Sequence, residues 1–201
     1  LGKDSILELS ESNHDLIHDA FKVKAAGNHL SILVAGRSVH APYPVIGGFN
    51  HFPQGNEIGN VIEELKTIRP IVLKLIELFF NTNSSFVRKT NFVALAAEEY
   101  GFLKGCIKST EGYCIEEENY YRHLQRVVIP YSEAVGYEFH GKEYMVGALA
   151  RMNLNKELLH QNTKRDAAKY LSAFPSFNIF HNNLAQAIEI LHSIDHSISL
   201  L

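Results

Sequence analysis

Residues 14–53 read HDLIHDAFKVKAAGNHLSILVAGRSVHAPYPVIGGFNHFP, a helical pattern followed by a stretch that resists helix formation. The spacing of apolar residues predicts a helix over His14–Ala35. Ser12 or Asn13 can cap its start, and Gly36 is well placed to end it. The apolar positions are Leu16, Ile17, Ala20, Phe21, Val23, Leu30, Leu33 and Val34. The rest of the stretch holds three prolines and a Gly-Gly pair, so we expect a rigid loop.

Helical spacing continues along most of the chain. A second long helix is expected over Glu57–Asn81, and Pro70 should kink it or divide it in two. Because both long helices carry apolar stripes that need cover, they should pack together. Further helices are expected over Lys156–Leu171 and Asn183–Leu200.

The middle of the chain favours shorter elements. We expect short helices over Phe92–Tyr100 and Glu116–Gln125. The alternating stretch Tyr137–Gly147 predicts a small hairpin that turns at His140-Gly141. The predicted fold is therefore mainly α, a multihelical lobe with long packed helices and a small β-hairpin.

Composition narrows the class of protein. The chain has 201 residues, of which 46% are hydrophobic and 20% charged, with a net charge of −3. These values are typical of one soluble globular domain, which we assign to residues 1–201. The chain has no basic stripe, which argues against nucleic-acid binding. It also has no apolar run of eighteen residues, so no membrane span is expected.

The two cysteines, Cys106 and Cys114, are separated by seven residues, which matches no common zinc or iron–sulfur spacing. We expect free thiols in a reducing cytoplasm, with a disulfide as the less favoured alternative. The chain begins at Leu1 and stops at Leu201 inside an apolar helical pattern. We therefore expect it to be an internal piece of a longer protein.

The loop AGRSVHAPYPVIGGFN, residues 35–50, is the strongest candidate for a site. Arg37 and His40 place a permanently charged guanidinium beside a titratable imidazole, which suits a polar site or a subunit contact. Gly47 and Gly48 allow close approach of the backbone. The alternative is an ordinary structured loop, and the residues alone favour that alternative.

Two helical histidine pairs, His14/His18 and His192/His196, have the spacing that can chelate a metal. Neither has an accompanying carboxylate motif, and two ligands without a third make a weak site, so no metal site is predicted. The sequence also lacks phosphate-binding, dinucleotide-binding and serine-hydrolase motifs. Taken alone, the residues name no reaction.

Three segments, in order, resemble the large subunit of nickel-iron hydrogenases of the cytoplasmic branch linked to NAD(P), a deazaflavin or sulfur. AGRSVHAPYPVIGGF resembles that family's "GGR-x-x-HP…GG" loop. YMVGALARMNLN resembles "VGPLAR-x-N", and NNLAQAIEILHSIDHSISLL resembles the "N-x-x-AR-x-x-E" helix. The opening LGKDSILEL is also similar to the segment before the first motif, so the resemblance covers nearly the whole chain.

The chain departs from the family pattern at four positions, which are Ala35, Ala41, Ala148 and Gln186. The larger departure is the absence of both C-x-x-C motifs, whose four thiolates hold nickel and iron in the family. Histidine pairs would not replace these soft ligands. The resemblance therefore implies a middle portion without catalytic, cofactor-binding or metal-ligating residues of its own.

The resemblance implies that the complete protein is an enzyme, a cytoplasmic hydrogenase with a nickel-iron centre that oxidises H2 or reduces protons. It implies an iron–sulfur small subunit and electron-transfer subunits as partners, with Arg37 and His40 at the interface near a cluster. Two alternatives stay open. One is a metal-free, hydrogenase-related subunit of an assembly like respiratory complex I, and the other is a stand-alone helical binding protein.

Overall fold

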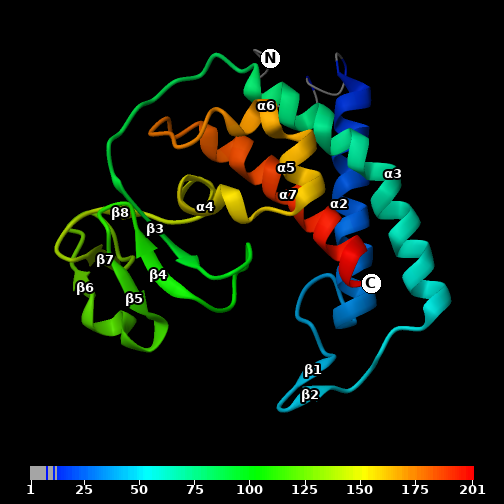
Figure 1. Ribbon diagram of the computed structural model, residues 1–201, viewed down its shortest axis with the longest axis horizontal. Helices are drawn as coiled ribbons and strands as arrows, with labels where there is room; N and C mark the ends of the chain where they lie inside the picture. Colours follow the sequence, from blue (N-terminus) through cyan, green and yellow to red (C-terminus); the bar gives the residue numbers. More distant parts are fainter. Residues whose placement is uncertain (1–7, 9–10, 12) are drawn as a thin grey trace. The chain divides into compact units, whose positions relative to one another are not determined.

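The computed structural model describes Glu8, Glu11 and residues 13–201 (Figure 1). These residues divide into two compact units. Unit 1 comprises the chain up to Leu75 together with His196–Leu201, and unit 2 comprises Ile76–Asp195. The assignment of residues 1–201 to one domain stays a prediction.

Unit 1 begins with α2, His14–Ala35, whose bounds are those expected from the sequence. Asn13 occupies the N-cap position without a side-chain hydrogen bond to the helix, and Ser12 lies outside the described residues. Gly36 ends the helix in the left-handed region at φ 87°, and its N–H donates to the Ile32 carbonyl at 2.8 Å. The predicted stop at this glycine is thus confirmed.

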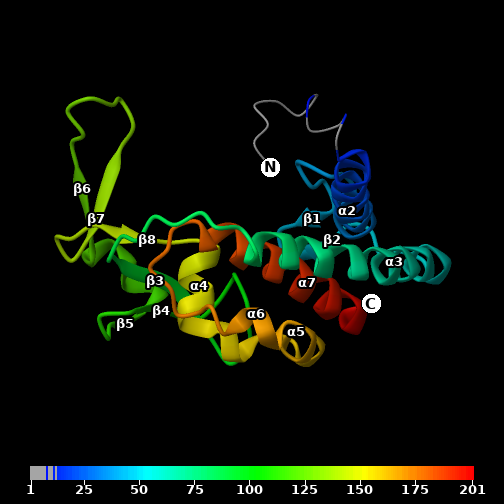
Figure 2. The same cartoon turned by 90° about the horizontal axis from the view of Figure 1, so that it is seen from above.

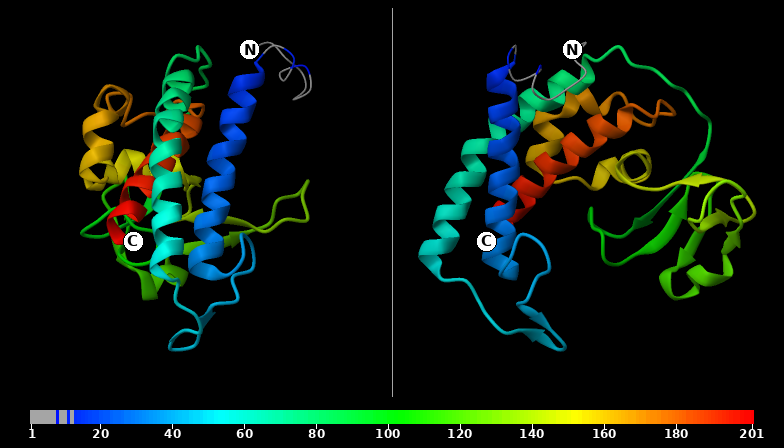
Figure 3. Two further views of the ribbon diagram at one scale, coloured as in Figure 1. Left: turned by 90° about the vertical axis from the view of Figure 1, so that its right-hand side faces the viewer. Right: turned by 180° about the vertical axis from the view of Figure 1, so that it is seen from behind.

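After α2 the chain forms a two-stranded ribbon of β1, Pro44–Val45, and β2, Gly48–Phe49. The helix α3, Gly55–Phe80, follows and begins in unit 1. It continues through Pro70, so the chain is not divided there into two helices. The views in Figure 3 show α2 beside the first part of α3.

Contacts in unit 1 confirm that the two long helices pack together. Ala26 of α2 is fully buried, and four positions of α3 within the unit are buried. These are Val61, Leu65, Ile68 and Val72. His29 Nδ1 lies 2.9 Å from each carboxylate oxygen of Glu64, which links α2 to α3.

Unit 2 contains more strand than the sequence predicts. Its four-stranded sheet has the order β5-β4-β3-β8, in which only the β3–β8 pair is parallel. The bounds are β3 Asn91–Ala96, β4 Cys106–Ser109, β5 Cys114–Glu116 and β8 Tyr144–Met145. A separate ribbon pairs β6, Leu124–Val127, with β7, Gly136–Phe139, and is shown in Figure 2.

Three predictions for the middle of the chain are wrong. Phe92–Tyr100 is not a helix, because most of β3 lies within it. The first four residues of β3 are all buried, so the sequence lacks the alternation of apolar and polar residues that marks a half-exposed strand. Of Glu116–Gln125, only η1, a 3₁₀ helix over Glu117–Arg122, is helical. Tyr137–Gly147 turns as expected, but β7 pairs with β6 and β8 pairs with β3, so it is no independent hairpin.

The helices of unit 2 follow the last strand. They are α4 Ala148–Asn155, η2 Lys156–Leu158, α5 Gln161–Asp166, α6 Ala168–Leu171 and α7 His181–Leu200, whose end lies in unit 1. The single helix predicted over Lys156–Leu171 is wrong, since extended backbone at Leu159 and His160 interrupts it. The last helix is confirmed, starting two residues earlier than predicted.

A disulfide joins Cys106 of β4 to Cys114 of β5, with the two Cα atoms 5.6 Å apart. The expectation of free thiols is therefore wrong. In the antiparallel register Lys108 faces Cys114 and Cys106 faces Glu116, so the cysteines are diagonal neighbours across one hairpin. The seven intervening residues supply the reversal that brings them together.

The fold class is only partly as predicted, because roughly half of the chain is helical and the sheets are more extensive than one small hairpin. Among the described residues, no helix is long and apolar enough to cross a lipid bilayer.

Candidate functional site

The loop that carries Arg37 and His40 is held by its own backbone. The N–H of Tyr43 donates to the carbonyl of Ala35 at 3.3 Å, and the N–H of Asn50 donates to the carbonyl of Tyr43 at 2.9 Å. His40 adopts a φ of 56°, one of two positive values among the described residues other than glycine. A fixed backbone of this kind presents the side chains of the loop in defined positions.

Arg37 and His40 are both exposed. Within the described part of the chain, neither side chain makes a hydrogen bond or an ion pair. Their proposed place at a subunit interface therefore stays a prediction. Their exposure does mean that a partner could reach both groups without rearrangement of the loop.

The loop that carries these two polar residues also carries exposed apolar side chains. Ile46, at the tip of the β1–β2 ribbon, is fully exposed. Other exposed apolar side chains of the loop are Val39, Val45, Phe49 and Phe52. A hollow of about 290 Å³ lies beside the loop, and it is lined by His29, Ile32, Leu33, Tyr43, His51, Glu57, Asn60 and Val61. The surface therefore combines exposed apolar side chains with a recess of mixed polarity.

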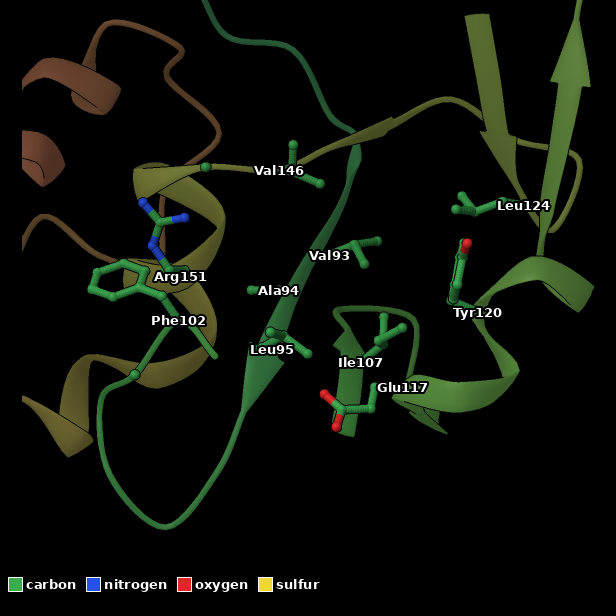
Figure 4. Close-up of a pocket in the computed structure, with 12 residues that line it drawn as sticks. Val93, Ala94, Leu95, Phe102, Ile107, Glu117, Tyr120, Leu124, Val146 and Arg151 are labelled. Carbon is green, nitrogen blue, oxygen red and sulfur yellow. The ribbon is translucent and has the colours of Figure 1, made fainter. Parts of the chain in front are cut away.

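Unit 2 has a second hollow, of about 430 Å³, against the β3–β4 part of its sheet (Figure 4). Apolar side chains such as Val93, Leu95 and Ile107 line most of it. Arg151 and Phe102 lie on one side of this hollow and Tyr120 lies on the other (Figure 4). It offers an apolar recess with few polar groups.

Arg151 belongs to a network that ties α4 to α7. Its Nε and Nη2 donate to the two carboxylate oxygens of Glu189 at 2.6 and 2.9 Å. The hydroxyl of Tyr100 donates to the same carboxylate at 2.6 Å, and the guanidinium lies 4.9 Å from the ring centre of Phe102. The charges are paired inside the protein, so this network positions helices and supplies no free acid or base.

The network shifts two pKa values. Burial, followed by the negative charge of Glu189, raises the pKa of Tyr100 far above its ordinary value. The hydrogen bonds to Glu189 raise the pKa of Arg151 despite partial burial. Tyr100 therefore stays a neutral donor, and Arg151 stays charged.

The ion pair also connects two of the segments that carry the family resemblance. Arg151 is the arginine of YMVGALARMNLN, and Glu189 is the glutamate of NNLAQAIEILHSIDHSISLL. Neither residue is among the site residues expected from the sequence. The sequence signal that could have identified them is a charged residue at a motif position with mostly apolar neighbours.

The two histidine pairs with helical spacing have different surroundings. His192 is 4% exposed, its Nδ1 accepts from the N–H of His160 at 3.0 Å, and its Nε2 lies 3.4 Å from the Tyr100 carbonyl oxygen. It is therefore a core histidine with both nitrogens engaged. The rings of His14 and His18 contact each other on α2.

The described residues do not fit a nickel-iron centre of the kind expected from the resemblance. Such a centre requires four thiolates, whereas the two cysteines of this chain are joined to each other. Across Glu8, Glu11 and residues 13–201, no group of three or more histidine, cysteine, aspartate or glutamate side chains could hold a metal ion.

Comparison with known sequences finds no matching family model. The chain is 28% identical over 204 residues to the alpha subunit of sulfhydrogenase 1 of Pyrococcus furiosus, an alignment that covers all of this chain and 48% of the relative. It is 26% identical to the alpha subunit of sulfhydrogenase 2 of the same organism, over 96% of this chain and 45% of the relative. The chain thus spans about half the length of these curated relatives.

Solved structures share the fold. An NAD+-reducing [NiFe]-hydrogenase in the H2-reduced state matches 97% of this chain and 49% of its own, with a TM-score of 0.78 and 20% identity. A variant of the [NiFeSe] hydrogenase from Desulfovibrio vulgaris Hildenborough matches 96% of this chain and 50% of its own, with a TM-score of 0.62 and 16% identity.

Proposed function

We propose that this chain, which is homologous to sulfhydrogenase alpha subunits and has the fold of hydrogenase large subunits, acts as part of the large subunit of a nickel-iron hydrogenase. The complete enzyme would interconvert H2 with two protons and two electrons. The observation that carries the proposal is the alignment with a sulfhydrogenase alpha subunit along the whole of this chain. The Arg151–Glu189 pair adds support, because it joins two of the resembling segments.

The role proposed for these residues is that of a scaffold. Since their donor groups do not fit a nickel-iron centre, we place the ligands of that centre in segments of the complete protein other than residues 1–201. The helices and sheet described here would then support those segments and contribute to the contact with partner subunits.

We further propose that the loop around Arg37 and His40 contacts an iron–sulfur small subunit, through which electrons would leave towards further subunits. Support comes from the exposure of both residues and of the apolar side chains of the same loop. A fixed imidazole can donate a hydrogen bond towards a cluster ligand and so tune its potential. Arg37 supplies five donors for a carboxylate or for carbonyl groups of the partner.

A cytoplasmic location is part of the proposal. The Cys106–Cys114 disulfide argues against this location. Disulfides are rare in most reducing cytoplasms and persist mainly where the surrounding thiol pool is oxidised. The state of these cysteines in freshly broken cells, trapped by a thiol-alkylating reagent, tests this part directly.

The function itself is tested on the complete protein, purified with its partner subunits. We expect about one nickel per large subunit, together with H2-dependent reduction of an artificial dye. An intact assembly without nickel and without this activity would contradict the proposal and favour a metal-free relative of the hydrogenases.

The interface is tested separately with Arg37→Ala and His40→Ala. Both variants should weaken subunit association or slow electron transfer to the natural acceptor while nickel content is retained. Arg126→Ala and His18→Ala remove exposed residues of the same two types elsewhere and should behave as wild type. Normal assembly and electron transfer in both loop variants would refute the interface.

A further inference from the structure

The hollow of about 430 Å³ in unit 2 opens onto a buried cluster of the same unit. That cluster consists of Val93, Ile115 and Phe139, and Ile107 and Leu124 pack against it. Val93, Ile107 and Leu124 also line the hollow. Figure 4 shows Val93 on β3 and Leu124 on β6 across the hollow from each other. The cluster is therefore left without cover on this side.

The rim of the hollow carries large apolar side chains that are open to water. Phe102, Tyr120 and Val146 line the hollow and are 51%, 54% and 58% exposed. Leu103, which follows Phe102 in the chain, is 88% exposed. Single exposed apolar side chains are common on monomeric proteins, whereas a group of them around one recess marks a surface that another segment covers.

The charged side chains of the hollow are unsuited to a polar small molecule. Arg151 and Glu117 both line it, but the Arg151 guanidinium already donates twice to Glu189. Glu117 begins η1 and is exposed, and in the part of the chain that the structure describes it makes no hydrogen bond or ion pair. A small-molecule site needs several convergent polar groups. This lining suits apolar side chains accompanied by one positive charge beside Glu117.

The size of the hollow limits what can enter it. A helix is about 10–12 Å across with its side chains, so a whole helix does not fit into about 430 Å³. A few apolar side chains do fit, if they project from a segment that lies across the opening. The occupant is thus a peptide segment that contributes side chains and keeps its own backbone at the rim.

The length of the relatives indicates where such a segment comes from. The alignment with the sulfhydrogenase 1 alpha subunit covers 48% of that relative, and the match to the NAD+-reducing hydrogenase structure covers 49% of that chain. Under the proposed function, the other half belongs to the same polypeptide as residues 1–201. Covalent linkage gives its segments a high effective concentration at this surface, an advantage that a separate subunit lacks.

We propose that this hollow is the docking site for an apolar segment of the same complete large subunit, from outside residues 1–201. The segment inserts apolar side chains between Val93 and Leu124 and places a lysine or arginine beside Glu117. This inference rests on the proposed function, because a complete large subunit supplies the segment. Docking would cover the buried cluster and the apolar rim in one step.

The test uses a photo-crosslinking amino acid, p-benzoylphenylalanine, at position 120 of the complete protein purified with its partner subunits. Tyr120 lines the hollow, and the probe keeps an aromatic ring there. Irradiation should join position 120 to a peptide of the same chain outside residues 1–201, identified by mass spectrometry as apolar with a lysine or arginine. The matched control is the same probe at Tyr121, which is 59% exposed and does not line the hollow.

The probe at position 121 should not give this cross-link. The proposal is overturned if position 120 gives no cross-link, or joins only to residues 1–201, to another subunit or to a second copy of the chain. It is also overturned if position 121 joins to the same peptide as position 120, because the contact would then lie outside the hollow.

A pair of substitutions provides a second measurement on the complete protein. Val146 is more than half exposed within the described residues, so Val146→Asp should be tolerated unless another segment covers it. We expect Val146→Asp to lower the melting temperature by several degrees, because docking would bury the new charge. Val128→Asp, at a position that is 90% exposed and away from the hollow, should leave it unchanged. Equal melting temperatures for Val146→Asp and wild type would overturn the proposal.

Nickel content and H2 oxidation, measured on the same samples, report on the proposed function. Samples that hold nickel and oxidise H2 but lack the expected cross-link would contradict the docking site alone. Samples that give the cross-link without nickel or activity would contradict the proposed hydrogenase function and leave the docking site supported.

Discussion

At the scale of single residues, the Glu189 carboxylate has two hydrogen-bonding partners in unit 2, Arg151 and Tyr100. It accepts from Arg151 twice and from Tyr100 once, and its side chain is 12% exposed. Removing it leaves a charged group and a hydroxyl without their partner in a poorly solvated region. Such a loss is more costly than the loss of an exposed pair, because the abandoned groups cannot regain water.

We therefore predict that Glu189→Ala lowers the free energy of unfolding by about 2 kcal/mol. This loss is smaller than the loss typical of a fully buried ion pair, because the Arg151 side chain keeps some contact with solvent. The matched control is Glu143→Ala, which removes the partner of Arg88 in an exposed pair and should cost less than about 0.5 kcal/mol. Urea unfolding measures both, and equal losses would contradict the structural role of Glu189.

A second prediction concerns His181, whose pKa is lowered from its ordinary value of 6.5 by burial. Since the folded state binds the proton less readily than the unfolded state, acidification favours unfolding. The stabilising contribution of the neutral ring is complete above pH 6.5 and is lost as the pH falls through the lowered value. His181→Asn should reduce the dependence of the free energy of unfolding on pH below pH 6.5. An unchanged slope in this variant would refute the prediction.

At the scale of elements, the end of α2 depends on one glycine. Gly36 has a φ of 87°, and an added Cβ would lie 2.8 Å from the ring of Tyr43 and 2.9 Å from Pro42 Cγ. Alanine would meet both a backbone penalty and a steric clash at this position.

Gly36→Ala should therefore lower the free energy of unfolding by about 1–2 kcal/mol or more. Gly27 lies within the same helix, and a Cβ added there would have no neighbouring atom within 4 Å, so Gly27→Ala should raise stability by about 0.5–1 kcal/mol. Thermal unfolding compares the two variants, which carry the same chemical change. If both substitutions changed the free energy of unfolding in the same direction, helix propensity alone would account for their effects.

The β4–β5 hairpin is the second element with a specific test. The Cys106–Cys114 bond closes a short loop, and the chain-entropy model assigns about 2–3 kcal/mol of stabilisation to a loop of this length. The double variant Cys106→Ser/Cys114→Ser should lose stability of that order, and a reducing agent should destabilise wild type only. Mass spectrometry after alkylation establishes the oxidation state, and free thiols in the air-purified protein would contradict the bond.

At the scale of the whole molecule, the absence of suitable thiolates leads to a prediction about metals. Residues 1–201, produced alone, should hold no stoichiometric nickel or iron, because the two cysteines are joined and histidine pairs are poor substitutes. Metal analysis of the reduced and oxidised forms tests this. About one nickel per chain, lost on mutation of Cys106 or Cys114, would overturn the expectation.

The sequence by itself determined the long helices and the rigid loop. Apolar spacing and Gly36 located α2, and α7 was predicted to within two residues, because local periodicity and a glycine cap act over a few neighbouring residues. The three resembling segments also pointed to the hydrogenase large subunit, which the comparisons support.

Only the tertiary structure decided the sheets, the disulfide and the side-chain networks. β3 is buried along most of its length, so its sequence lacks a strand period, and β8 finds its partner more than forty residues away. The Arg151–Glu189 pair likewise joins residues on different elements. Such contacts depend on how distant segments pack in space, and the spacing of residues along the chain does not predict that packing.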